Sequence, residues 1–294
     1  MNMETNEIDI IAESLIFDLT KAFGLPPTKG AKSIVRLLLG KVAHRAAEFA
    51  MEVDCAVAEG GAAGGARRSL PHFVKSYEAR GLENIPPAGP LIVASNHPAF
   101  IDSFVITAYM DRPDYKAIIG DIPFLENMPH IREHAIFAPD EGNTMGRMQV
   151  IRESIRHLKQ GGALLVFPRG SIEADPEFMP DPGAEFHYWS RSLEIFMQRV
   201  PNLQILVTTV SGVISPAAMR HPITWFRRAR PDKQRLAFIY QLAWQILGGR
   251  QKFDLTPRVT FGEVLNGNHY EHMLAEIEQA ACRTLEKHMA WKHV

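Results

Sequence analysis

The sequence contains few cysteines and almost no net charge. Only two of its 294 residues are cysteines, Cys55 and Cys282, and they lie far apart in the chain. This count argues against a disulfide scaffold or a cysteine-rich zinc site and is typical of a reducing compartment. The formal net charge is −1 at pH 7, so bulk charge gives no sign of a polyanionic partner, and we expect no nucleic-acid binding.

Long apolar runs and several common motifs are also missing. The apolar stretch 34–39 is interrupted by Arg36 and is too short to cross a bilayer. The sequence contains no dinucleotide-binding glycine motif, no phosphate-loop lysine and no Gly-x-Ser-x-Gly elbow, which argues against a nucleotide enzyme and a serine hydrolase. His130 and His134 have helical spacing but no evident third ligand, so we expect no metal. The polar N-terminus is unlike a signal peptide.

What is present is an alternation of helical and strand patterns in a chain with 46% apolar residues. Strands are predicted at residues 91–95, 116–119, 135–138, 163–167, 203–210 and 257–264. Helices are predicted at residues 102–110, 145–160, 190–200, 232–247 and 269–290. This alternation indicates an α/β fold with a mixed, largely parallel sheet flanked by helices.

The N-terminal part has a different pattern. Apolar residues follow helical spacing over 8–23 and 31–57, and the Gly/Ala-rich stretch 60–65 is expected to act as a flexible linker. We therefore expect a helical appendage at residues 1–66 and an α/β domain at residues 67–294. The appendage is either a packed cap or a surface whose apolar face rests on lipid while lysines and arginines meet the headgroups.

The strand at 91–95 leads directly into Asn96-His97-Pro98, and Asp102 follows. If a helix starts near Asp102, its carboxylate can reach the imidazole, fix the tautomer and stabilise the imidazolium. His97 would then be a general base for a substrate hydroxyl or amine, because no nucleophilic serine or cysteine lies nearby. The alternative is a chance pairing, since this spacing is common.

A second strand, 163–167, ends in Pro168-Arg169-Gly170-Ser171. Gly170 would let backbone N–H groups approach a ligand, and Arg169 could hold a carboxylate or phosphate. The alternative is an ordinary turn with an exposed arginine.

Together, His97-x4-Asp102 and the later Phe167-Pro168-x-Gly170 resemble the glycerolipid acyltransferase family, over roughly residues 70–265. The resemblance implies transfer of a fatty acyl group from acyl-CoA or acyl carrier protein to a hydroxyl of a glycerolipid or lysophospholipid. It also implies that His97 is the general base and Asp102 its orienting partner. No cofactor beyond the acyl thioester co-substrate is expected.

The sequence departs from the family pattern at positions that the family associates with the acceptor. Arg169 stands where the family has glutamate, and Ile172 and Asp140 stand where it has arginine. Three interpretations therefore remain: an O-acyltransferase, a catalytically altered relative that only binds lipids or acyl chains, and an N-acyltransferase of an amino-lipid. We expect the substrate to be bound by residues that follow three strands, namely Asn96, Arg169, Gly170, Ser171, Ser211 and Gly212. An ordinary turn is the alternative at the last two.

Lipid substrates require contact with a membrane surface. Trp225 and Phe226 precede Arg227 and Arg228, and aromatics with flanking cations suit a lipid interface. The alternative is a partly buried aromatic pair beside a basic loop. We expect a cytoplasmic protein, peripheral on the inner face of the membrane.

Overall fold

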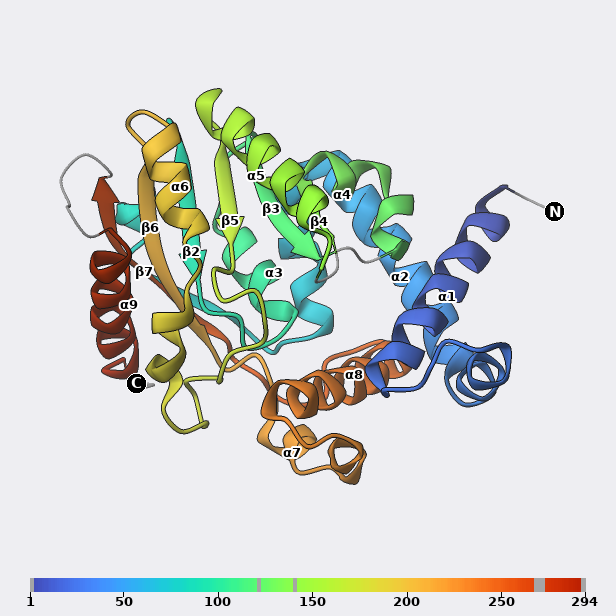
Figure 1. Ribbon diagram of the computed structural model, residues 1–294. Coiled ribbons are helices and arrows are strands. Elements are labelled where there is room, and N and C mark those ends of the chain that lie inside the picture. The colour runs from blue at the N-terminus through green and yellow to red at the C-terminus, as the bar shows by residue number, and fades with distance from the viewer. Residues whose placement is uncertain (1–2, 121–122, 140–141, 267–272, 292–294) are drawn as a thin grey trace.

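In the computed structural model, one mixed sheet carries helices on both faces (Figure 1). The structure describes residues 3–120, 123–139, 142–266 and 273–291. Within them, the sheet has the order β1 (Glu78–Arg80), β7 (Arg258–Asn266), β6 (Gln204–Ser211), β2 (Leu91–Ser95), β5 (Ala163–Val166), β3 (Tyr115–Gly120) and β4 (Ala135–Ala138). The five strands from β6 to β4 are parallel, whereas β7 is antiparallel to β6 and pairs in parallel with β1. The predicted α/β class with a mixed, largely parallel sheet is confirmed.

Alternate side chains of the central strand enter two separate cores. Leu91 and Val93 of β2 pack in a cluster that also contains side chains of α3 (Ile101–Thr107) and α8 (Arg230–Gly248). Ile92 and Ala94 point to the other face, against α5 (Thr144–Lys159), α6 (Ser192–Arg199) and α9 (Met273–Met289). Because both faces are covered, β2 and β5 are buried along their whole length, and their sequences are continuous apolar runs.

The N-terminal helices α1 (Met3–Ala22) and α2 (Lys29–Ser69) pack against each other and against the segment that holds α4 (Pro129–Glu133). The remaining helix, α7 (Pro216–Met219), is short and precedes α8. None of the described helices combines the length and the apolar composition needed to cross a membrane.

The predicted flexible linker at residues 60–65 is wrong. These residues lie within α2, which kinks at Gly61, where φ is 65° and ψ is −175°. The kink brings Gly65 against Val57, and a Cβ placed on Gly65 would lie 2.4 Å from Val57 Cγ2. The glycines therefore permit a close-packed bend, because glycine adopts positive φ freely and leaves room for a neighbouring side chain. The expected boundary after residue 66 falls within this helix.

Candidate active site

His97 and Asp102 are in direct contact where β2 leads into α3. Asp102 Oδ2 lies 2.9 Å from His97 Nδ1, which confirms the predicted contact. Asp102 is completely buried and also accepts hydrogen bonds from the backbone N–H groups of Ala99 (2.9 Å) and Ser103 (2.6 Å). These bonds fix the carboxylate, which in turn fixes the imidazole, while 26% of the His97 side chain stays exposed.

The surroundings of His97 favour its protonated form. Burial alone would lower the pKa of the imidazole, but the charge and hydrogen bond of Asp102 outweigh it, with a smaller contribution from Glu173, and the pKa is raised above 6.5. Arg235 on α8 acts in the opposite direction. A base whose conjugate acid is stabilised in this way holds a proton readily once it has taken one.

Phe167 lies on the other side of the imidazole. The parallel strands β2 and β5 are paired with Ala94 opposite Val166, so the residues that follow them emerge side by side. The rings of His97 and Phe167 are stacked, with centroids 4.1 Å apart and planes 23° apart. Sheet register thus brings the two predicted motifs into one site, as is common at the carboxyl ends of parallel strands.

Glu173 binds the peptide that carries His97. Its carboxylate accepts a hydrogen bond from His97 N (3.0 Å) and another from Trp189 Nε1 (3.0 Å), while its own N–H donates to His97 O (2.8 Å). The side chain is completely buried. Burial raises the pKa of Glu173 to about 7, although its hydrogen bonds act to lower it.

Gln234 of α8 joins the same two loops from the outside. Its side-chain amide donates to Pro98 O (3.1 Å) and Glu173 O (2.8 Å). Glu173, Trp189 and Gln234 were not among the site residues predicted from the sequence. Gln234 stands between Lys233 and Arg235, and Glu173 is followed two residues later by Asp175, so neither had a local signal that set it apart. Their partners lie far away along the chain.

The turn after β5 carries a small cluster of charges. Arg169 Nε lies 3.4 Å from Glu185 Oε1, and its guanidinium is 5.3 Å from the centre of the Tyr188 ring. Arg230 Nη2 donates to the same Glu185 carboxylate (2.6 Å) and to Ile172 O (3.3 Å). Two cations therefore share one carboxylate beside the His97 loop.

Gly170 and Ser171 complete this turn. Gly170 has φ 69° and is exposed, and its N–H donates to Phe167 O at 3.0 Å. Ser171 is half-buried. The turn follows Phe167 directly, so it lies close to the imidazole, and a substrate-binding role for Arg169, Gly170 and Ser171 stays a prediction. Asp140 lies outside the described residues.

Known proteins share sequence features or the fold of this chain. Residues 76–220 match the acyltransferase family model. This part of the chain is an acyltransferase-family domain. A search of curated proteins finds no match. The fold is similar to the crystal structure of the 1-acyl-sn-glycerophosphate (LPA) acyltransferase PlsC from Thermotoga maritima, with a TM-score of 0.52 and 16% sequence identity over 99% of this chain and 97% of that chain.

Within this acyltransferase, three of the predicted substrate-binding residues have structural roles instead. Asn96 is buried, and its amide exchanges hydrogen bonds with the backbone of Val210 (2.9 and 2.8 Å). This side chain continues the pairing of β2 with β6 for one more step, so the prediction that it contacts substrate is wrong.

The prediction that Ser211 and Gly212 line a substrate channel is also wrong. Ser211 is completely buried, and its hydroxyl lies 2.8 Å from His288 Nε2 on α9. The buried Gly212 N–H donates to Asp175 (2.9 Å). Both residues hold the end of β6 against its surroundings, since strand-end polar groups that are buried need internal partners.

The aromatic residues Trp225 and Phe226 are each 75% exposed, so the alternative of a partly buried pair is wrong. They lie in a short 3-10 turn, Pro222–Phe226, just before α8. Arg227 is paired with Asp232 at 2.7 Å, whereas Arg228 is exposed. A Cβ placed on Gly24 would meet the Arg227 guanidinium, so this turn lies beside the connection between α1 and α2.

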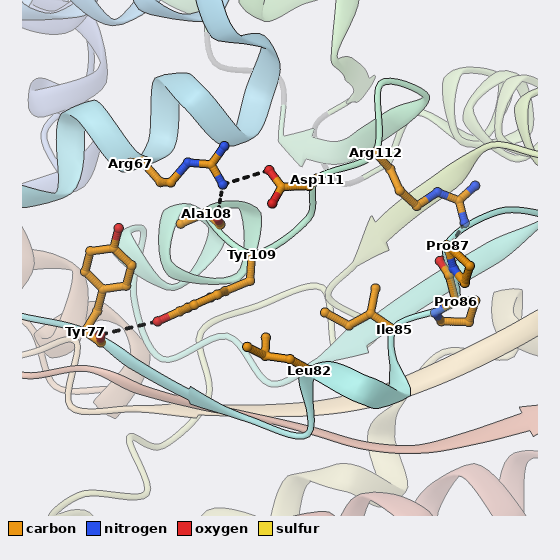
Figure 2. Close-up of a pocket in the computed structure, with 10 residues that line it drawn as sticks. All are labelled: Arg67, Tyr77, Leu82, Ile85, Pro86, Pro87, Ala108, Tyr109, Asp111 and Arg112. Carbon is orange, nitrogen blue, oxygen red and sulfur yellow. Dashed lines mark hydrogen bonds and ion pairs between the residues drawn. The ribbon is translucent and has the colours of Figure 1, made fainter.

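A separate cavity of about 430 Å³ lies at the far end of α3 from Asp102 (Figure 2). Its two arginines already have internal partners: Arg67 bonds Ala108 O and Asp111, and Arg112 bonds Asp114 and three backbone carbonyl groups. We assign no function to it.

Proposed function

We propose that this acyltransferase moves a fatty acyl group from a thioester of CoA or acyl carrier protein to a hydroxyl of a glycerolipid or lysophospholipid. The observation that carries the proposal is the bond of His97 Nδ1 to the buried Asp102 on a partly exposed imidazole. With Nδ1 occupied, Nε2 is the nitrogen that can exchange a proton with a substrate.

The reaction needs no other group to change its covalent state. The acceptor hydroxyl gives its proton to His97 Nε2 while its oxygen attacks the thioester carbonyl carbon. The C–S bond then breaks, and the departing thiolate takes the proton from the imidazolium. The new ester bond and the free thiol balance the step, and His97 returns to its neutral form. General-base assistance of this kind contributes roughly 10²–10⁴-fold to the rate.

The charges near the site favour an acceptor with an anionic headgroup. Arg169 and Arg230 outnumber Glu185 beside the turn, and Arg235 on the same helix as Arg230 is exposed and near enough to His97 to influence its pKa. Arginine suits phosphate because its planar fork donates two parallel hydrogen bonds.

The proposal is tested with His97→Ala, two thioester donors, and lyso-lipids with and without a phosphate. Thiol release and product mass are measured together. We expect the variant to lose roughly 10²–10⁴-fold in rate, while the surface variant His44→Ala keeps wild-type turnover. Undiminished turnover in His97→Ala would remove the proposed base.

The same assay separates the two alternatives. An amide product would identify an N-acyltransferase of an amino-lipid. Lipid binding with no thiol release for any acceptor would identify the altered relative that binds lipids or acyl chains. The retained contact between His97 and Asp102 favours catalysis over binding alone.

We also propose that the protein binds the membrane surface peripherally, on the inner face. Leu37 and Leu38 of α2 are 85% and 73% exposed, and lysines and arginines lie between the apolar residues of that helix. The exposed Trp225 and Phe226 lie in the turn beside the connection between α1 and α2. Exposed aromatic and aliphatic side chains with nearby cations are typical of an interfacial surface.

Liposome co-sedimentation tests this surface. A double alanine variant of Trp225 and Phe226 should remain largely in the supernatant with anionic vesicles that pellet the wild type. The control is Met145→Ala, which changes an exposed apolar residue on α5. If the double variant and the wild type pellet equally, these two aromatics are not the membrane contact.

A further inference from the structure

Glu173 is a buried carboxylate beside the base, and the reaction step described above does not use it. It comes from the loop after β5, whereas His97 comes from the loop after β2. The two residues exchange hydrogen bonds twice: His97 N donates to Glu173 Oε2 (3.0 Å), and Glu173 N donates to His97 O (2.8 Å). These two hydrogen bonds tie both backbone polar groups of His97, its N–H and its C=O, to one residue.

The Glu173 side chain has little freedom to move. Its second oxygen accepts from Trp189 Nε1 (3.0 Å), and its backbone oxygen accepts from Gln234 (2.8 Å). Asp175, two residues later, accepts four backbone N–H bonds from Glu177 and residues 212–214, which anchors the loop that carries Glu173. A carboxylate held this firmly can hold its partner peptide, because each bond fixes a donor whose position is otherwise free.

The charges around the pair decide what Glu173 does electrostatically. His97 and Glu185 influence the pKa of Glu173, whereas Asp102 and Arg235 act on that of His97. Arg230 of α8 donates to Ile172 O, next to Glu173, and to Glu185. Glu185 is engaged by two arginines, and Asp102 is already bonded to the imidazole. In its ionised form, which is favoured above its pKa of about 7, Glu173 therefore adds a second negative charge near a ring that becomes positive during the reaction.

We propose that Glu173 is a positioning residue that fixes the peptide carrying His97 and stabilises the imidazolium formed during acyl transfer. This role rests on the proposed function, in which His97 is the base. It assigns a task to a residue that lies beyond the Phe167-Pro168-x-Gly170 turn. Trp189 and Gln234 support Glu173 in this task.

The test compares Glu173→Gln with Trp189→Phe, and uses Trp244→Phe, an exposed tryptophan on α8, as the matched control. Glu173→Gln removes the charge, so the pKa of His97 should fall. The acid limb of kcat/KM should move to lower pH by the same amount, and kcat should fall roughly 10- to 100-fold because the base is less well placed. Trp244→Phe should match the wild type in each measurement.

Trp189→Phe keeps the carboxylate but removes one of its hydrogen bonds, which raises the pKa of Glu173 further. More Glu173 is then neutral at a given pH, so the pKa of His97 should shift in the same direction as in Glu173→Gln, by a smaller amount. This variant also serves if Glu173→Gln does not fold. Melting temperatures establish that each variant used is folded.

NMR titration of the His97 imidazole makes the test independent of turnover. The titration needs no substrate, so a lowered His97 pKa in the variants supports the proposal even if the acyl acceptor is wrongly assigned. Failure of this proposal can therefore be distinguished from failure of the proposed function. An unchanged His97 pKa and an unchanged pH profile in folded Glu173→Gln, or in Trp189→Phe if the former is unfolded, would overturn it. A loss of kcat without either shift would show a purely structural role and would also overturn it.

Discussion

The ring of Phe167 covers one face of the His97 imidazole at a centroid distance of 4.1 Å. The contact helps to hold the imidazole in place, which the hydrogen bond to Asp102 would otherwise do alone. Such aromatic pairs contribute about 0.5–1.5 kcal/mol beyond their area. The two motifs of the sequence therefore depend on each other physically.

Phe167→Leu should lower kcat up to about 10-fold, since losing the stack costs up to about 1.4 kcal/mol of positioning. KM should change less, because the imidazole acts mainly in the chemical step. Phe178→Leu, a partly exposed ring on the following segment, is the control. Steady-state kinetics of both variants decide the matter, and equal kcat values would contradict the proposed contribution of the stack.

Asp102→Asn should move the acid limb of the pH–rate profile to lower pH. The carboxylate raises the pKa of His97 against the effect of burial, so its loss lowers that pKa. In the wild type, activity should therefore fall as the pH drops through a value above 6.5. The variant should also lose roughly 10²-fold in rate or more, because the imidazole is no longer oriented. A limb that stays in place would show that Asp102 does not act on the imidazole.

Gly65→Ala should destabilise the protein by about 1–3 kcal/mol, because the added methyl group meets Val57 across the kink in α2. Gly64→Ala is the matched control. A Cβ at Gly64 meets no described atom within 4 Å, so this change should be neutral or stabilising by up to about 1 kcal/mol. Urea denaturation measures both. Equal effects would contradict the close packing of the kink.

His288 should make the protein less stable in acid. Burial lowers its pKa to about 4, assisted by Arg258, so the folded state binds fewer protons than the unfolded state between about pH 4 and 6.5. The free energy of unfolding therefore falls as the pH drops through this range, by about 3 kcal/mol from this group.

The variant His288→Gln isolates this contribution, because Glu173 and Asp175, with raised pKa values, have the opposite dependence in both proteins. Denaturation at about pH 7 and about pH 4.5 should show a loss that is larger in the wild type by roughly 2–3 kcal/mol. Identical losses would contradict the buried neutral state of His288.

Local patterns allowed much of the fold and half of the site to be predicted. The strands at 91–95 and 135–138 were predicted with the bounds that the structure shows, because buried apolar runs with clear breakers are legible in sequence. The contact between His97 and Asp102 was predictable because the two residues lie five positions apart, where a strand leads into the first turn of a helix. The edge strand β1 was missed, since its three residues carry no periodic signal.

The long-range part of the site could not be predicted. Asn96 and Ser211 are polar residues at strand ends, where ligand-binding residues are common. Their side chains instead bond Val210 and His288, which come from elsewhere in the chain. Glu173 lacks any local mark because its role depends on sheet register. The glycines at 60–65 were misinterpreted since one composition permits both flexibility and close packing, and only neighbouring atoms decide between them.

The amide of Gln234 clamps two loops that arise from different strands. Gln234 lies near the N-terminal end of α8, so this end of the helix is fixed to the loops that carry His97 and Glu173. The turn that bears Trp225 and Phe226 directly precedes the same end of α8. The exposed aromatic pair and the loops that hold the base are therefore attached to one end of a single helix, only a few residues apart along the chain.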